Sequence, residues 1–244
     1  MIPGQISWFA VLAIIACAVA QAQEFSCPSG AADVMKYFVL NKQRRAAYFL
    51  AGKPNGIYTE VFPDRDFAAE GHWLWLKSPK ARGFDVKAFD ERYVYMRSTE
   101  LKWKDKRTFK RFAHDLPIAA RCVLEGKPGP QIKVDNTSFG YYRDCMLFKS
   151  SNIGKALIDL DAPEQMDAGE SLGRVWTRVL HYRYDCDKDY DHCRQEEQFF
   201  LANGYGLWRW RHFKQGTLVK TALMNELKEG RATESLGCRE SYEK

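Results

Sequence analysis

The sequence predicts an all-β chain, namely an antiparallel β-sandwich of the jelly-roll, concanavalin-like type with one or two short helices and about three disulfides. Three observations lead to this fold class. Many short segments are rich in aromatic and β-branched residues, helical periodicity is thin, and an even number of cysteines follows an apolar leader. The 244 residues are 45% hydrophobic and 14% aromatic, which excludes a disordered chain.

The first element is a short apolar leader. Residues 6–22 contain no charged side chain and end in the small residues Ala20 and Ala22, as signal-peptidase sites do. We therefore predict a signal peptide over residues 1–22, a single β-sandwich domain over 23–244, and a secreted or periplasmic protein. A membrane anchor and a lipoprotein box ending at Cys17 are the alternatives. The run is short for a span, so no stable membrane span is expected after signal removal.

Six cysteines remain after the leader, and in an exported chain they predict three disulfides. Cys186 and Cys193 bracket a short polar loop that a hairpin would close. Cys27 and Cys238 lie near opposite ends of the mature chain, so a bridge between them would tether the termini. Cys122 and Cys145 complete the set. Sequence alone does not choose among the fifteen pairings of six cysteines.

Strand signals dominate from Ala46 onward, separated by turn residues such as Asn55-Gly56 and Asn203-Gly204. The expected strands are Ala46–Leu50, Ile57–Phe62, His72–Leu76, Arg92–Trp103, Phe139–Phe148, Val175–Tyr184, Gln198–Leu201, Leu207–Phe213 and Leu218–Leu227. Helical turns are expected only within Ala31–Asn41 and Arg107–Ala113.

The strand near the C-terminus carries the clearest candidate binding surface. Trp208, Trp210, His212 and Lys214 alternate along it, so they project from one side. Indole rings stack on sugar C–H groups, and a lysine can meet a carboxylate, so this row predicts recognition of an acidic sugar. The alternative is that both tryptophans fill the interior and the two polar residues lie at its rim.

Three motifs resemble those of alginate-lyase-type polysaccharide lyases, which are secreted jelly rolls. The segment from His212 to Gly216 is similar to their Tyr-Phe-Lys-x-Gly strand. The segment from Arg97 to Lys102 is similar to Arg-Ser-Glu-Leu-Arg, and Gln131-Ile132-Lys133 is similar to Gln-Ile-His. The resemblance implies β-elimination from a uronate, with Arg97 and Gln131 as substrate-binding residues.

The chain departs from that family at two catalytic positions, where Lys133 and Leu218 replace the usual histidine and tyrosine. β-Elimination needs a base, a proton donor and a cation that neutralises the carboxylate. We assign His212 and Tyr182 as the acid–base pair and Lys133 as the neutralising cation. Tyr141, Tyr142 and Tyr184 are alternative proton donors.

An acidic segment follows the expected strand Val175–Tyr184. Its oxygen ligands have the spacing of a calcium loop, although Tyr190 stands where such a loop requires glycine. The candidate ligands are Asp185, Asp187, Asp189, Asp191 and Glu196. The alternative is a solvated hairpin tip. Calcium is the one cofactor that the sequence suggests.

The formal net charge is +6, and a basic run extends from Lys102 to Arg111. In an exported protein this run favours acidic glycans over nucleic acid, and a solvated edge strand is the alternative. We therefore expect a secreted protein that recognises, and in one version cleaves, an acidic polysaccharide. A non-catalytic glycan- or protein-binding module using the same aromatic face is the alternative, and an inhibitor or toxin-like protein remains open.

Overall fold

The computed structural model describes residues 25–38, 45–50, 58–60, 71–78, 83–103, 106–143, 146–170 and 172–229. The expected signal peptide therefore lies outside the described residues, as do Cys145 and Cys238. Among the described residues no helix is long and apolar enough to cross a membrane.

The described chain consists almost wholly of antiparallel strands, which confirms the predicted β class. The first half contains β1 (Ala31–Asp33), α1 (Met35–Phe38), β2 (Arg45–Leu50), β3 (Tyr58–Glu60), β4 (Gly71–Ser78), β5 (Gly83–Phe89), β6 (Tyr93–Trp103), β7 (Lys106–Ala120) and β8 (Cys122–Leu124). The second half contains β9 (Ile132–Arg143), β10 (Met146–Leu160), β11 (Glu164–Asp167), β12 (Arg174–Cys186), β13 (Cys193–Ala202), β14 (Gly206–Lys214) and β15 (Thr217–Glu229).

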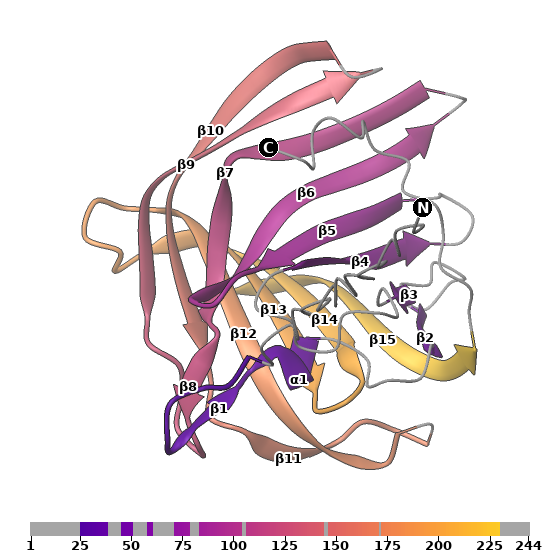
Figure 1. The fold of residues 1–244 in the computed structure, drawn as a ribbon. Coiled ribbons are helices and arrows are strands. Elements are labelled where there is room, and N and C mark those ends of the chain that lie inside the picture. The colour runs from indigo at the N-terminus through magenta and orange to yellow at the C-terminus, as the bar shows by residue number, and fades with distance from the viewer. Residues whose placement is uncertain are drawn as a thin grey trace, which may run out of the picture.

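The strands form two layers that cross each other (Figure 1). One layer contains β4 to β7 with β9 and β10, and the other contains β12 to β15. Neighbouring strands follow chain order from β2 to β7 and from β12 to β15, while β2 pairs with β15. A jelly roll would place Greek-key crossovers among these strands. The described order is instead a meander, because strands that follow one another in the chain are antiparallel neighbours from β2 to β7 and from β12 to β15.

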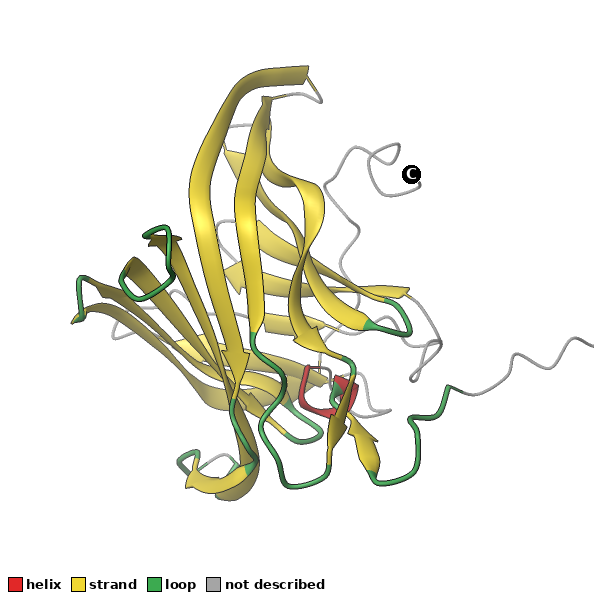
Figure 2. Ribbon diagram, turned by 90° about the vertical axis from the view of Figure 1, so that its left-hand side faces the viewer, coloured by secondary structure: helices red, strands yellow, loops and turns green. Residues whose placement is uncertain are grey.

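Strand β10 links the two layers. Its second half pairs with β9 on one edge and with β12 on the other, so Ile158 lies opposite both Ile132 and Tyr182. Ile158 is fully buried in the core between the layers. Helix α1 packs against β13 and β14 near one end of the layers (Figure 2), where it contributes Met35 and Phe38 to that core.

Two local expectations were wrong. Arg107–Ala113, expected as a helical turn, belongs to β7, because its backbone completes ladders with both β6 and β9. Phe139–Phe148, expected as one strand, is divided between β9 and β10, whose ends Arg143 and Met146 pair as a hairpin. In both cases tertiary pairing overrides the local pattern.

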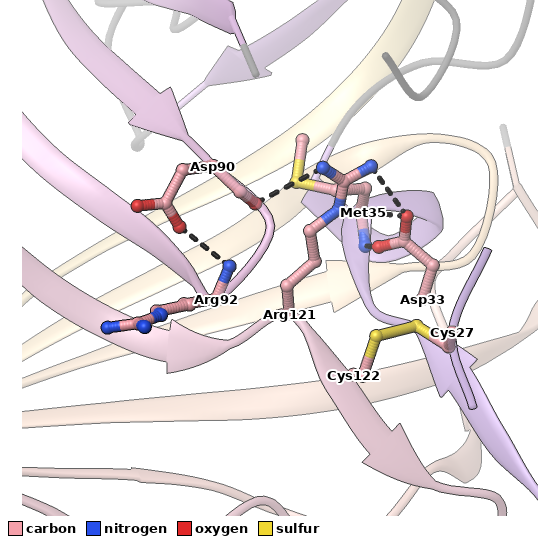
Figure 3. Close-up of a disulfide and its surroundings, with 7 residues drawn as sticks. All are labelled: Cys27, Asp33, Met35, Asp90, Arg92, Arg121 and Cys122. Atoms are coloured by element: carbon pink, nitrogen blue, oxygen red, sulfur yellow. Dashed lines mark hydrogen bonds and ion pairs between the residues drawn. A yellow bond between two sulfur atoms is a disulfide. The ribbon is translucent and has the colours of Figure 1, made fainter. Parts of the chain in front are cut away.

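Two disulfides lie among the described residues. The predicted Cys186–Cys193 bridge is confirmed at the β12–β13 hairpin. The predicted Cys27–Cys238 bridge is wrong, because Cys27 bonds to Cys122 instead. This bridge lies beside the β1–β8 pair (Figure 3), since Asp33 and Cys122 are register partners.

Candidate functional site

The strand that the sequence analysis singled out passes from the core towards solvent. Trp208 is only 2% exposed, and its Nε1–H donates to the Thr177 hydroxyl at 3.2 Å. Trp210 and His212 are partly buried, and Lys214 is exposed. The prediction that Trp208 lies on a binding surface is therefore wrong, because this part of β14 faces Phe200 and the core.

Trp210 and His212 face a carboxylate on the neighbouring strand. Directly paired residues of antiparallel strands project from the same face, and Glu197 of β13 pairs with both Tyr182 of β12 and His212 of β14. Tyr184 follows Tyr182 by two residues and Trp210 precedes His212 by two residues, so they share this face. We call Tyr182, Tyr184, Glu197, Trp210 and His212 the Glu197 cluster.

The Glu197 carboxylate is held by two aromatic donors. The indole Nε1–H of Trp210 donates to Oε2 at 2.8 Å, and the Tyr184 hydroxyl donates to Oε1 at 3.4 Å. An ionised carboxylate can accept about four hydrogen bonds. These two contacts therefore orient Glu197 and leave it acceptor capacity for a further donor.

Two stacked pairs of rings surround this carboxylate. The rings of Tyr182 and Tyr184 stack with their centroids 4.9 Å apart, and those of Trp210 and His212 stack at 6.0 Å. His212 is oriented by its Nε2–H, which donates to the Gln195 side-chain oxygen at 2.9 Å. The cluster thus combines one negative charge with several π faces.

Tyr182 carries an unpaired polar atom at this site. Its side chain is 4% exposed, and its hydroxyl finds no hydrogen-bond partner among the described residues. Burial raises the pKa of Tyr182 well above its ordinary value, and the nearby Glu197 charge raises it further. Burial and Glu197 also raise the pKa of Tyr184. Both phenols therefore remain neutral donors, and a buried donor without a partner is costly.

The expected catalytic set is not brought together. Across the sheet, Lys133 pairs with Leu157, and Leu157 pairs with Arg183. Arg183 directly follows Tyr182 in β12, so the two side chains project from opposite faces. Lys133 therefore projects from the face opposite Tyr182 and His212. Its ammonium lies 5.1 Å from the Tyr190 ring centroid. The assignment of these three residues to one catalytic centre is wrong.

A concave feature away from the Glu197 cluster gathers basic and amide side chains at the foot of β9. It is a pocket of about 610 Å³ lined by Arg92, Tyr93, Ala120, Pro130, Gln131, Ile132 and Lys133. We call it the basic pocket. It unites Gln131 and Lys133 of the predicted site, whereas Arg97 belongs to β6 and its side chain lies outside the described part of the structure.

Asp90 fixes the turn that presents Arg92 and Tyr93 to the basic pocket. Its Oδ1 accepts the backbone N–H groups of both residues at 2.7 Å, and its Oδ2 accepts the Tyr95 hydroxyl (Figure 3 shows the Arg92 contact). Burial opposes ionisation, but these hydrogen bonds together hold the pKa of Asp90 below its usual value. On another wall, the Gln131 amide donates to Asp159 at 2.9 Å.

The five candidate calcium ligands do not converge. Glu196 accepts hydrogen bonds from His181 Nδ1 at 2.8 Å and from Gln198, which places it on a strand face away from the loop. Asp187 instead accepts the Asp191 backbone N–H at 3.0 Å. Within the described residues no group of three or more acidic, histidine or cysteine side chains could hold a metal ion.

Tyr190 explains the shape of that hairpin tip. It adopts a left-handed backbone with φ of 68°, and its hydroxyl donates to Asp135 of β9 at 2.8 Å. The ammonium of Lys155 donates to the same Asp135 oxygen and lies 4.7 Å from the Tyr190 ring centroid. The tip is therefore fastened to β9 and β10 by side-chain contacts.

No protein family, curated protein or solved structure matches this chain at significant similarity. The site must therefore be interpreted from its own chemistry. Glu197, the centre of the cluster, was not among the residues that the sequence pattern singled out. The signal available in the sequence was the position of Glu197, an acidic residue just before the apolar run Phe199–Leu201.

Proposed function

We propose that this protein is a non-catalytic binding protein whose Glu197 cluster takes a small organic cation. The observation that carries this proposal is a carboxylate held between aromatic rings. A cation gains from the negative π face of tryptophan and tyrosine as well as from the carboxylate, and both terms increase when water is partly excluded. An acidic sugar would instead be repelled by Glu197.

The polar groups of the cluster support an ammonium ligand. Glu197 retains acceptor capacity, so an ammonium N–H can donate to it. The buried Tyr182 hydroxyl lies close enough for the Glu197 charge to affect it, and it would gain a partner from a ligand acceptor group. Binding rather than catalysis is favoured because Lys133 projects from the opposite face of the sheet.

Isothermal titration calorimetry of the secreted protein tests this proposal. The probes are benzylammonium and choline, and benzyl alcohol is the neutral isostere. We expect both cations to bind and the alcohol to bind much more weakly. Glu197→Gln should weaken benzylammonium binding about 10- to 100-fold, since hydrogen bonds to charged groups contribute about 1.5–3 kcal/mol.

Glu164→Gln is the matched control, because Glu164 is an exposed residue of β11 that pairs with Thr177, outside the cluster. It should bind both cations as the wild type does. Equal binding of benzyl alcohol, unchanged affinity in Glu197→Gln, or no binding of either cation at millimolar concentration would disprove the proposal.

A second candidate function is recognition of an acidic polysaccharide, and the basic pocket favours it. Arg92, Gln131 and Lys133 line one concavity, and guanidinium and ammonium groups bind carboxylates and sulfates. The resemblance to polysaccharide lyases agrees with this substrate class. This candidate uses a different face from the Glu197 cluster, so the two functions are separable by mutation.

Retention on immobilised alginate and heparin tests the second candidate. The double variant Arg92→Gln/Lys133→Gln should elute at clearly lower salt, while Lys220→Gln, which removes an exposed charge on β15, should elute nearer the wild type. Equal elution of the two variants would contradict a role for the basic pocket. Absence of uronate double-bond absorbance from soluble polymer would limit the function to binding.

The setting of both functions is also inferred. We infer export after removal of residues 1–22, with residues 23–244 forming one domain. Two disulfides support this inference, since such bonds persist in oxidising compartments. We also infer that the two crossed layers form a sandwich, because buried side chains from both fill the space between them.

A further inference from the structure

The hairpin end formed by β9 and β10 exposes a run of large apolar side chains. Met146, Leu147 and Phe148 are 72%, 56% and 51% exposed. They are consecutive, so they project from both faces of β10. A strand packed on a layer would bury alternate residues, yet every residue from Met146 to Ser150 is exposed.

The position of this end explains its exposure. β9 and β10 pair with each other as far as Arg143 and Met146, beyond the part where β10 also pairs with β12. Figure 2 shows the pair extending well past the layer of β12 to β15. Exposed apolar residues that occur together commonly mark an interaction site.

Cations flank the apolar residues. The Arg143 guanidinium lies 4.9 Å from the Phe148 ring centroid, and the Lys149 ammonium lies 5.9 Å from the Tyr141 ring centroid. Their charged groups thus accompany an apolar end, while Tyr141 and Tyr142 add rings with a polar tip. Long cationic side chains and tyrosines of this kind suit the boundary between water and lipid.

The neighbouring strand adds more positive charge. β7 pairs with β9 at this end, where Thr108 lies opposite Arg143 and Lys110 opposite Tyr141. The sequence of the β6–β7 hairpin end, residues 99–111, holds six basic residues and two acidic ones. The backbone of β7 from Thr108 to Arg111, which belongs to the basic run, therefore lies beside the strand that ends at the exposed apolar hairpin.

We propose that this end of the molecule docks on the surface of an anionic lipid bilayer. Met146, Leu147 and Phe148 enter the boundary between headgroups and acyl chains, and Arg143 and Lys149 contact the lipid phosphates and carboxylates. Apolar insertion together with electrostatic attraction is the combination that binds peripheral proteins. Neither the Glu197 cluster nor the basic pocket takes part.

Co-sedimentation with lipid vesicles tests this proposal. The secreted protein should sediment with vesicles of phosphatidylcholine and phosphatidylserine, and much less with phosphatidylcholine alone. Leu147→Ser/Phe148→Ser should weaken binding at least about tenfold, because it removes buried apolar area. Arg143→Gln/Lys149→Gln should weaken it about 25-fold, at about fivefold for each cation.

The matched control is Leu218→Ser/Val219→Ser, which removes two exposed apolar residues of β15 that are 48% and 52% exposed. It should bind vesicles as the wild type does. All the substituted side chains are exposed, and Arg143 and Lys149 are replaced by polar glutamine. Thermal unfolding of each variant verifies that it is folded. The proposal would be overturned by failure to bind phosphatidylserine vesicles, by equal binding to both vesicle types, or by equal loss in the control.

A second copy of this chain is the competing occupant. If the wild type is a dimer by light scattering and Leu147→Ser/Phe148→Ser is a monomer, the hairpin end is a protein interface and the lipid proposal is wrong. Cation binding at the Glu197 cluster should be unchanged in this variant, so the two proposals fail independently.

Discussion

Arg121 shows how single residues fix the end of the molecule near helix α1. Its side chain is fully buried, and its Nε and Nη2 groups donate to Asp33 Oδ2 at 3.0 and 2.9 Å (Figure 3). Nη1 donates to the Asp90 carbonyl, and the guanidinium lies 3.5 Å from the Phe25 ring centroid. One cation therefore joins β1, the β5–β6 turn and the first described residues.

Asp33→Asn is expected to destabilise the protein strongly. The change removes the negative charge beside a buried guanidinium, which costs about 3 kcal/mol in comparable pairs. Asp33 Oδ1 also accepts the Met35 N–H at 2.9 Å, and the asparagine side-chain oxygen can still do so. The loss of stability therefore measures the removal of the charge. Urea unfolding measures it. The exposed change Glu125→Gln should alter stability by less than about 0.5 kcal/mol, and an equal effect of both would contradict the argument.

The residue scale also shows what alternation along a strand leaves open. Sequence correctly placed Trp210 and His212 on one face of a strand, but a bulge in β14 turns Trp208 to the opposite face, where it meets Phe200 and Thr177. Trp208 packs on Phe200 and donates to Thr177, whereas Trp210 turns its N–H to Glu197. The sequence does not reveal this contact, because Glu197 and Trp210 lie on different strands.

At the scale of elements, the two described disulfides constrain very different lengths of chain. Cys186–Cys193 closes a separation of 7 residues at one hairpin, whereas Cys27–Cys122 closes a separation of 95 residues. Loop closure in the unfolded chain costs more entropy for the longer loop. The bridge at β8 should therefore contribute more to stability than the bridge at the hairpin.

Replacing each pair by alanine measures this difference. Loss of Cys27–Cys122 should lower the free energy of unfolding by about 4–5 kcal/mol, and loss of Cys186–Cys193 by about 2 kcal/mol, as chain entropy predicts. Urea unfolding of both double variants gives the comparison. A hairpin variant that loses as much stability as the Cys27–Cys122 variant would show that local contacts of the tip, such as those of Tyr190, dominate instead.

Element prediction succeeded where the local pattern and the tertiary pairing agree. The strands β12 and β14 and the bridge at Cys186 have local signals, namely alternating aromatic residues and a short polar loop. Arg107–Ala113 failed because its short apolar spacing also fits a turn of helix, and only pairing with β6 and β9 selects the strand. The hairpin between β9 and β10 failed because its turn has no glycine or proline signal.

At the scale of the whole molecule, the two layers give each strand face a different environment. One face of β12, β13 and β14 carries Tyr182, Glu197 and Trp210, while the opposite face carries Phe200 and charged pairs such as Arg183 with Asp159. The basic pocket lies at the foot of β9, and the apolar hairpin end lies at the other end of that strand. Three candidate surfaces are thereby kept apart.

The sequence by itself determined the antiparallel β character of the chain and the Cys186–Cys193 bridge, because both depend on residues close together along it. Only the tertiary structure decided that Cys27 bonds to Cys122, that Lys133 and His212 lie on opposite faces, and that Glu197 meets Trp210 and Tyr184. The physical reason is that alternation defines two faces of a strand, whereas packing of distant strands decides what each face meets.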